Sequence, residues 1–305
     1  MKAMSSLAWV GAALTALWPV SSVAWHDAGH EKLTATALRI SRDAVPDFLF
    51  AGRDLVVHCS RDPDLFADKS MPELRSTETP EHYIDMEFLG GQPLPQTRHD
   101  FVAWCSAHRI EPGAVGFLPY AVTEWTERLA LVLAEYRKWP ADPNVRTKAC
   151  VYAGILSHYA GDLSQPLHTT VDFDGRAGTN GVSPRSGIHA RVDALMGKLG
   201  GDPDGLASGL AARTLADMRE GVTSELARTQ ALVGRIYELE PRLPAAEAPI
   251  PDDAELKSFI TERARAGAAF IASLYRTAWE RSASVELPSW HGPAALTVAP
   301  GRPSR

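Results

Sequence analysis

The chain has 305 residues, of which 45% are hydrophobic and 22% are charged, and its formal net charge is −6. This composition is typical of a globular protein with one large or two small domains, and it excludes a chain that is disordered overall. The acidic balance argues against a module that binds nucleic acid through excess Lys and Arg. It does not exclude a hydrolase in which metal ions attract the phosphate.

Residues 1–24 have the pattern of a secretory signal peptide. Lys2 gives a positive start, 7–20 form an apolar run, and 22–24 offer small residues for cleavage. The apolar run is too short for a transmembrane helix, and no later segment approaches the roughly 20 apolar residues that a span requires. We therefore expect an exported, soluble protein that begins at Trp25 and is secreted or periplasmic.

The rest of the chain predicts an all-α fold, because apolar residues recur at helical spacing and strand patterns are nearly absent. We expect one multi-helix domain with a metal-lined cleft over 25–287, and a flexible, proline-containing tail over 288–305. The stretch 90–119 is interrupted by Gly and Pro and is expected to be rich in loops. Helices are expected from Gly29 onward, over 45–57, 120–139 and 147–163, from His189, and over 206–218, 220–238 and 253–281.

The segment from His158 to His168 offers three metal-ligand side chains within a short span. Apolar and small residues before Leu163 recur at helical spacing, so His158 and Asp162 lie at positions i and i+4 on one helical face. Pro166 cannot continue the helical hydrogen-bond ladder. We therefore expect the chain to turn there and to bring His168 back near the same place.

A second pair follows, because His189 and Asp193 have the same spacing at the start of an expected helix. Either pair alone would more often be a structural histidine or a surface ion pair. Two such pairs together with His168 are more than a core needs, and their donor atoms indicate a borderline-soft metal, with zinc as the first choice. The Gly-rich stretch 171–186 is expected to connect the two halves of the site.

Three further regions contain candidate ligands. The free amine and the carbonyl of Trp25 would form a five-membered chelate around a metal, with His30 about one and a half helical turns away. Asp62 and Asp64 lie in an acidic turn, where they are either ligands or solvated carboxylates. His82 is flanked by aromatic and aliphatic residues, so in isolation it would be a core histidine.

The chain contains only three cysteines, Cys59, Cys105 and Cys150, and none of them has CxxC spacing. At most one disulfide can form, and the sequence does not choose its pair. We expect buried structural thiols rather than a disulfide framework.

Together these residues resemble the tri-zinc superfamily that contains bacterial zinc-dependent phospholipase C and the fungal-type single-strand nucleases. The resemblance covers about half of the chain, and its most specific part is the segment from His158 to His168 with Gln-Pro before the last His. It implies an all-α fold and three zinc ions, two of them bridged by Asp162. The implied ligands are His82, His158, Asp162 and Asp62 (or, second, Asp64) for one ion, Trp25, His30 and Asp162 for another, and His168, His189 and Asp193 for the third.

The same resemblance implies an activity. Zinc lowers the pKa of water towards about 7 and thereby supplies hydroxide to attack a phosphodiester. The attacking water would belong to the pair of ions bridged by Asp162, with the acidic-turn carboxylate orienting it or taking its proton. Asp62 and Asp162 are therefore the catalytic candidates.

The two branches of the superfamily predict different substrates. The short step from Trp25 to His30 is similar to the nucleases, whereas Thr179-Asn180, Pro184 and the 187–193 segment are more similar to the phospholipases. Ala28 stands where phospholipases carry a choline-directed Glu. A phospholipase C-like enzyme, in peripheral contact with a lipid surface, is our first expectation. A single-strand nuclease or 3'-nucleotidase is the alternative, a non-enzymatic metal-binding or helical interaction protein is the third, and no protein partner is predicted.

Overall fold

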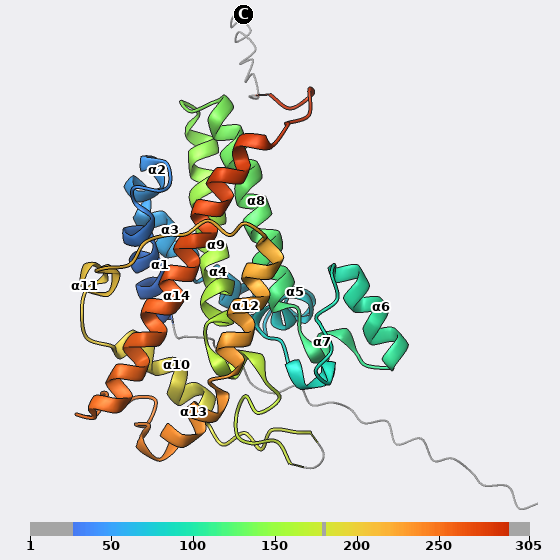
Figure 1. Ribbon diagram of the computed structural model, residues 1–305, viewed down its shortest axis with the longest axis vertical. Helices are drawn as coiled ribbons and strands as arrows, with labels where there is room; N and C mark the ends of the chain where they lie inside the picture. The colour runs from blue at the N-terminus through green and yellow to red at the C-terminus, as the bar shows by residue number, and fades with distance from the viewer. Residues whose placement is uncertain (1–26, 179–180, 293–305) are drawn as a thin grey trace, which may run out of the picture.

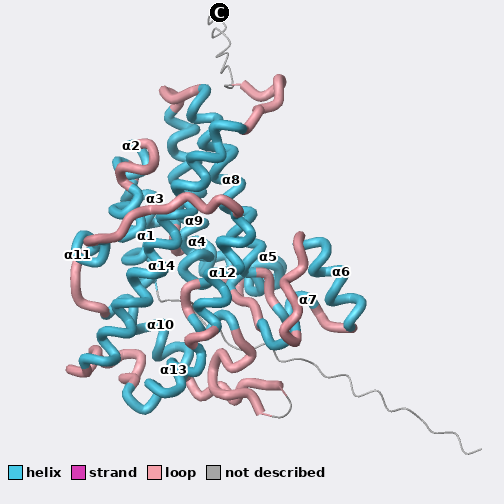
Figure 2. Tube along the Cα trace, viewed as in Figure 1, coloured by secondary structure: helices cyan, strands magenta, loops and turns pink. Residues whose placement is uncertain are grey.

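A computed structural model describes residues 27–178 and 181–292 of the chain. Within these ranges the regular structure is helical and contains no β-strand, apart from one isolated bridge between Phe173 and Gly175 (Figure 2). The all-α, single-domain expectation is confirmed. The expected signal peptide, Trp25 and Thr179-Asn180 lie outside the described residues, as does the tail beyond Gly292.

The helices follow one another along the chain with mostly short connections. The α-helices are α1 (Asp27–Ser41), α2 (Asp47–Ala51), α3 (Arg53–Cys59), α4 (Asp62–Phe66), α5 (Pro72–Glu78), α6 (Arg98–His108), α7 (Pro112–Val115), α8 (Leu118–Lys138), α9 (Pro143–Leu163), α10 (Ile188–Lys198), α11 (Pro203–Ala207), α12 (Met218–Gln230), α13 (Val233–Leu239) and α14 (Ala254–Arg281). The short 3-10 helices are η1 (Thr79–His82), η2 (Met86–Leu89), η3 (Pro166–Thr169), η4 (Glu240–Arg242) and η5 (Ser282–Ser284).

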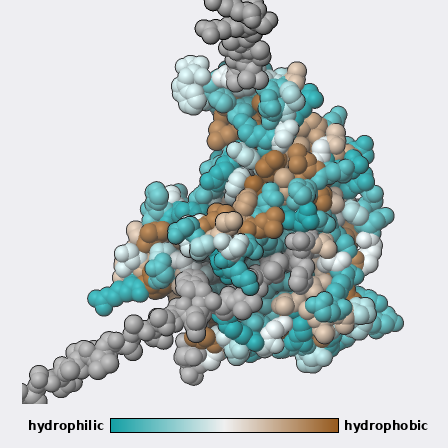
Figure 3. All heavy atoms as spheres, turned by 180° about the vertical axis from the view of Figure 1, so that it is seen from behind, coloured by the Kyte–Doolittle hydropathy of each residue, from teal (hydrophilic) through white to brown (hydrophobic). Residues whose placement is uncertain are grey.

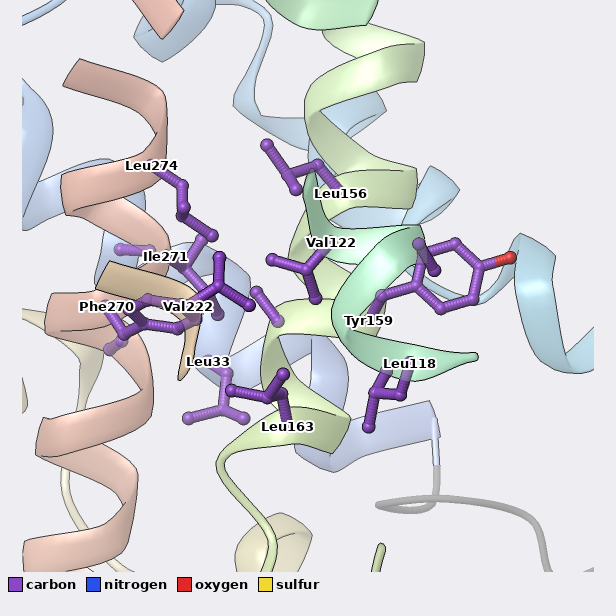
Figure 4. Close-up of a cluster of buried hydrophobic side chains, with 14 of the residues drawn as sticks. Leu33, Leu118, Val122, Leu156, Tyr159, Leu163, Val222, Phe270, Ile271 and Leu274 are labelled. Carbon is purple, nitrogen blue, oxygen red and sulfur yellow. The ribbon is translucent and has the colours of Figure 1, made fainter. Parts of the chain in front are cut away.

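Helix α9 lies at the centre of the fold. It packs against α8, α14, α3 and α1, and the three longest helices, α8, α9 and α14, run side by side (Figure 1). All residues from Ala153 to Leu163 are buried, so this half of α9 is enclosed on every side. Figure 4 shows the apolar core that α9 forms with neighbouring helices: Leu156, Tyr159 and Leu163 come from α9, and the other labelled side chains are Leu33, Leu118, Val122, Val222, Phe270, Ile271 and Leu274.

The ends of α9 are set by its sequence. Asp142 caps the N-terminus by accepting a hydrogen bond from the backbone N–H of Asn144, and Pro143 occupies the first turn, where it needs no donor. At the other end, Ser164 is the C-cap and Pro166 begins η3, which carries His168. The chain therefore turns directly after Asp162, as the sequence predicted.

Helix α3 approaches α9 unusually closely at Gly154. A Cβ atom on Gly154 would lie 2.5 Å from the carbonyl oxygen of Val56 and 2.7 Å from the Cβ of Cys59. Only a residue without a side chain fits between these backbones. This contact fixes the end of α3, which leads into the acidic turn of the site.

The expected helix over 206–218 is wrong. Helix α11 ends at Ala207, and residues 210–215 have no helical structure but run beside α14. There the backbone N–H groups of Arg213 and Leu215 donate to the hydroxyls of Ser273 and Thr277 on α14. Tertiary hydrogen bonds replace the helical ladder in this segment, and no local pattern signals them.

Three other expectations differ in detail. The expected helix over 45–57 is broken at Gly52 into α2 and α3, and that over 220–238 is broken between α12 and α13. The expected loop region 90–119 contains α6 and α7. Thr97 and Asp100 form a reciprocal capping box at the start of α6, a signal that was present in the sequence.

Other features concern the cysteines and the C-terminal end. Cys59, Cys105 and Cys150 are free and buried, as expected. Among the described residues, no helix is both long and apolar enough to cross a membrane. At the start of the expected tail, His291 Nε2 lies 3.2 Å from Glu135 Oε1, and its ring contacts that of Trp139.

Candidate metal centre

Among the residues that the structure describes, the predicted ligands converge at the C-terminal half of α9. Three groups of side chains each have their ligand atoms within 4.8 Å of one another, and all three contain at least one histidine and one carboxylate. Trp25 lies outside the described residues, and Asp62 is in none of the groups. The groups are His30, Asp64 and His158; His82, His158 and Asp162; and His168, His189 and Asp193.

In three histidines, a backbone carbonyl next to Nδ1 determines that Nε2 faces the cluster. His158 Nδ1 donates to the carbonyl of Ser60 at 2.7 Å, and His168 Nδ1 donates to the carbonyl of His82 at 2.6 Å. His189 Nδ1 lies 3.2 Å from the carbonyl of Phe173. A carbonyl only accepts, so each Nδ1 carries a proton and each Nε2 is the atom directed at the cluster, as in metal-ligating histidines.

The two carboxylate oxygens of Asp162 face different histidines. Its Oδ1 lies 3.3 Å from Nε2 of His30, whereas its Oδ2 lies 3.0 Å from Nδ1 of His82 and 3.4 Å from Nε2 of His158. The His30 and His158 rings stack at 3.8 Å between centroids, and Gly161 leaves room for the His30 ring. This arrangement is the one a carboxylate needs in order to bridge two cations.

In the acidic turn, Asp64 rather than Asp62 faces the cluster. Asp64 Oδ1 lies 3.8 Å from His158 Nε2 and 3.9 Å from His82 Nδ1. Asp62 instead interacts with the thiol of Cys59, whose pKa is raised to about 11 by burial and then by this carboxylate. The geometry therefore favours Asp64 as the ligand, which differs from the sequence-based preference for Asp62.

The third group combines η3 with α10. His189 Nε2 and Asp193 Oδ2 are 3.0 Å apart, one helical turn from each other, but they are not aligned as a hydrogen bond. The His168 and His189 rings lie 4.8 Å apart, and His168 Nε2 is buried without a hydrogen-bond partner. Three buried atoms with lone pairs are thus directed to a common region rather than to one another.

These contacts fit a borderline-soft divalent cation. Buried polar atoms in proteins are almost always hydrogen-bonded, because leaving one unsatisfied costs about 1–3 kcal/mol. Here His168 Nε2, His189 Nε2 and Asp193 Oδ2 are all buried without hydrogen bonds. Imidazole nitrogens and carboxylate oxygens are the donor set that zinc prefers when thiolates are absent, and none of the buried cysteines belongs to a group.

The electrostatics around Asp162 reflect this concentration of ligands. Burial opposes a charge on His158, but Asp162 and Asp64 more than offset it and raise the pKa of His158 to about 9. Burial, followed by the charge of His158, lowers the pKa of His30 to about 4. Burial would raise the pKa of Asp162, but His158 and His168 hold it well below its usual value. Without metal, the cluster therefore retains a proton that a cation would displace.

A cavity of about 200 Å³ is linked to the third group through Phe173. Its lining includes Phe88, Phe173 and Asp85, and Phe173 is the residue whose carbonyl lies against His189 Nδ1. Burial, then the charges of Glu87 and Asp172, raises the pKa of Asp85 well above its usual value. No local sequence pattern marks this cavity, because its lining comes from segments far apart in the chain.

Three exposed apolar side chains follow Asp64 in the chain. Leu65, Met71 and Leu74 are exposed and follow Asp64 along α4 and α5. The rear face of the molecule is mostly hydrophilic, with apolar residues in scattered patches (Figure 3). Single exposed apolar residues are common, so what distinguishes these three is that they follow Asp64 within ten residues of the chain.

Sequence reasoning also missed two contacts that support the ligands. Gln165 donates from its side chain to Asp193, although only the Gln-Pro pair had been noted as a motif. Tyr159 donates to Glu78, whose Oε1 lies 3.9 Å from His82 Nε2. The helical spacing of Tyr159 indicated a core residue, and nothing local shows that its hydroxyl meets a carboxylate from α5.

Similarity between this chain and known proteins is found among solved structures. No family model matches the chain, and no curated protein matches it. Among solved structures, the chain is similar to an alpha toxin from Clostridium absonum, with a TM-score of 0.47 and 15% sequence identity. The match covers 88% of this chain but only 66% of the toxin chain.

Proposed function

We propose that the protein is a zinc-dependent phosphoester hydrolase with the three-ion centre of the phospholipase C and single-strand nuclease superfamily. The observation that carries this proposal is the convergence of three His and carboxylate groups on one buried region, together with the three ligand atoms of the third group, which lack hydrogen bonds. His30, Asp64, His82 and Asp162, with His158, would hold two ions, and Trp25 would complete one of these sites. His168, His189 and Asp193 would hold the third.

The two carboxylates of the site, Asp162 and Asp64, differ in exposure and therefore have different roles. Bound zinc would supply hydroxide at neutral pH and neutralise the charge of the phosphate. Asp162 is fully buried, so it can hold cations but cannot meet the substrate. The side chain of Asp64 is 13% exposed, so it is the carboxylate of the pair that water can reach. We assign to Asp64 Oδ1 the orientation of the attacking water or the acceptance of its proton.

Two substrate classes have different structural support. A phospholipid is supported by the exposed apolar residues Leu65, Met71 and Leu74, which would rest on a lipid surface beside Asp64. A nucleotide or single-stranded nucleic acid is supported by the cavity with Phe88 and Phe173, because bases stack on aromatic rings. The cavity shares Phe173 with the His189 contact, so the nucleic-acid alternative has the more direct link to the centre.

Export is part of the proposal. Cleavage after Ala24 would give Trp25 a free amine and carbonyl for chelation. The ring of His30 already faces Asp162, which that ion would share. The mature domain would then span 25–287, in the periplasm or outside the cell.

The test is hydrolysis by purified protein that begins at Trp25. Phosphatidylcholine vesicles, single-stranded DNA and a 3'-nucleotide are offered in parallel, with and without a zinc chelator. We expect chelator-sensitive cleavage of one class and its loss in His189→Ala, which removes a ligand of the third group. Release of phosphorylated headgroup alone would select the phospholipase, and cleavage of DNA or the 3'-nucleotide alone would select the nuclease or nucleotidase. No turnover by zinc-loaded protein would contradict the proposal.

A further inference from the structure

The two halves of the third metal group come from separate parts of the chain. His168 follows α9 in η3, whereas His189 and Asp193 lie on α10, beyond the loop 170–187. The loop alone is a weak connection for a site that must hold its ligands precisely placed. The structure contains a direct link between the halves, the fully buried side chain of Gln165.

Gln165 bonds to both halves at once. Its backbone N–H donates to the carbonyl of Asp162 at 2.9 Å, and its carbonyl accepts from the backbone N–H of His168 at 3.1 Å. Its side-chain Nε2 donates to Asp193 Oδ1 at 2.7 Å. One residue therefore bonds to the backbone of Asp162, to the backbone of His168 in η3 and to the side chain of Asp193 on α10.

The hydrogen bond to Leu167 fixes the orientation of the Gln165 side-chain amide. Gln165 Oε1 accepts a hydrogen bond from the backbone N–H of Leu167. A backbone N–H can only donate, so the oxygen must face Leu167 and the NH₂ group must face Asp193. This hydrogen bond occupies Oδ1 of Asp193 and leaves Oδ2, 3.0 Å from His189 Nε2, as the ligand atom.

We infer that Gln165 is a positioning residue for the third ion: it selects which oxygen of Asp193 binds the metal and locks α10 to η3. The inference rests on the proposed metal centre. Hydrogen-bond partners of this kind orient metal ligands, and their removal costs about 10–100-fold in metal affinity. The effect is expected on one ion of three, because Gln165 touches the other groups only through its backbone.

Two substitutions separate this role from a structural role in the turn. Gln165→Glu keeps an acceptor for the N–H of Leu167 but replaces the donor to Asp193 by a second carboxylate. Gln165→Met keeps the volume and loses both hydrogen bonds. If Gln165 positions Asp193, both variants weaken the third ion; if it only caps η3, Gln165→Glu binds like the wild type.

The readout is the affinity of each ion, measured by zinc competition with a chromophoric chelator and by the absorption spectrum after Co²⁺ substitution. We expect a tenfold to hundredfold loss for one ion, with the other two retained. Ser164→Ala is the matched control, since Ser164 is the buried neighbour whose hydroxyl bonds only to the carbonyl of Ala160. Wild-type affinity of all three ions in Gln165→Glu would overturn the inference.

A second test, made in the Asp193→Ala protein, keeps the inference testable if a Gln165 variant folds poorly. In Asp193→Ala protein the third group has already lost a ligand, so Gln165→Glu should not change the affinity of the remaining two ions. A further loss of those ions would show that Gln165 does not act through Asp193. A wild-type chain that binds no zinc would instead refute the centre itself, while zinc binding without hydrolysis would refute only the proposed activity.

Discussion

Asp62 and Asp64 show how two neighbouring carboxylates acquire different roles. Successive residues of a helix are rotated by about 100°, so two residues that are two apart in α4 lie on nearly opposite faces. Pro63 between them is buried, which fixes the rotation of this short helix. Asp64 then faces His158 and His82, and Asp62 faces Cys59. The sequence could not decide between them, because packing sets the rotation of so short a helix.

This difference predicts the behaviour of two matched variants. Asp64→Asn removes a charged ligand from the first group, so we expect at least a tenfold loss of zinc affinity for one ion and a large loss of turnover. Asp62→Asn changes the same atoms two residues away and should leave both properties close to those of the wild type. Zinc titration of the two proteins makes the comparison. Equal losses, or a larger loss for Asp62→Asn, would restore the original preference for Asp62.

The spacing of the histidines was the most informative signal at the residue scale. The i and i+4 pairs placed His158 with Asp162 and His189 with Asp193, and the structure brings both pairs together. The carbonyls of Ser60 and Phe173, against which the outer nitrogens of His158 and His189 lie, were not predictable. They come from other segments, and any residue type supplies a carbonyl.

At the scale of helices, the site depends on how closely α3 packs against α9. We expect Gly154→Ala to destabilise the protein by about 1–3 kcal/mol or more, because the added methyl group would meet the Val56 carbonyl rather than a flexible side chain. The C-cap of α3 is Ser60, whose carbonyl holds His158, so zinc affinity should fall as well.

Gly234 provides the control for this prediction. It lies in α13, is exposed, and has no neighbour within 4 Å of an added Cβ. Gly234→Ala should therefore stabilise the protein by up to about 1 kcal/mol through helix propensity alone. Thermal unfolding of both variants, with and without zinc, tests the pair. A neutral Gly154→Ala would show that α3 can move away from α9 without cost.

Helix periodicity predicted the long elements well and the short ones poorly. Helices α8, α9 and α14 have many turns of consistent apolar spacing, and their existence was predicted correctly. The 206–218 segment has apolar residues too, but Arg213 and Leu215 gain hydrogen bonds from α14 that a helix would not offer them. Local propensity cannot compete with such tertiary partners over a few residues.

For the molecule as a whole, the cluster predicts how the stability of the metal-free protein depends on pH. His158 has its pKa raised from about 6.5 to about 9, so its contribution is full below pH 6.5 and is lost as the pH rises through 9. His30 has its pKa lowered to about 4, so stability is lost as the pH falls from 6.5 towards 4. Asp162, with its lowered pKa, adds a further loss at lower pH.

These opposing groups give a maximum of metal-free stability near pH 6.5. Zinc should move the maximum to higher pH, because it binds neutral His158 and releases its proton. Thermal unfolding in chelator and in zinc, between pH 4 and pH 9, measures both curves. Metal-free protein that becomes steadily more stable from pH 6.5 to 9 would contradict this assignment.

The number of zinc ions that the chain binds tests the three-ion centre most directly. The measurement is zinc per chain after exhaustive dialysis, for protein that begins at Trp25 and for protein with one residue added before it. We predict three ions in the first and weaker binding of one ion in the second, because the added residue removes the chelating amine. Asp162→Asn should lower the occupancy of two ions and His189→Ala that of one. Fewer than one ion per chain in the wild type, or the same loss in both variants, would contradict the three-ion centre bridged by Asp162.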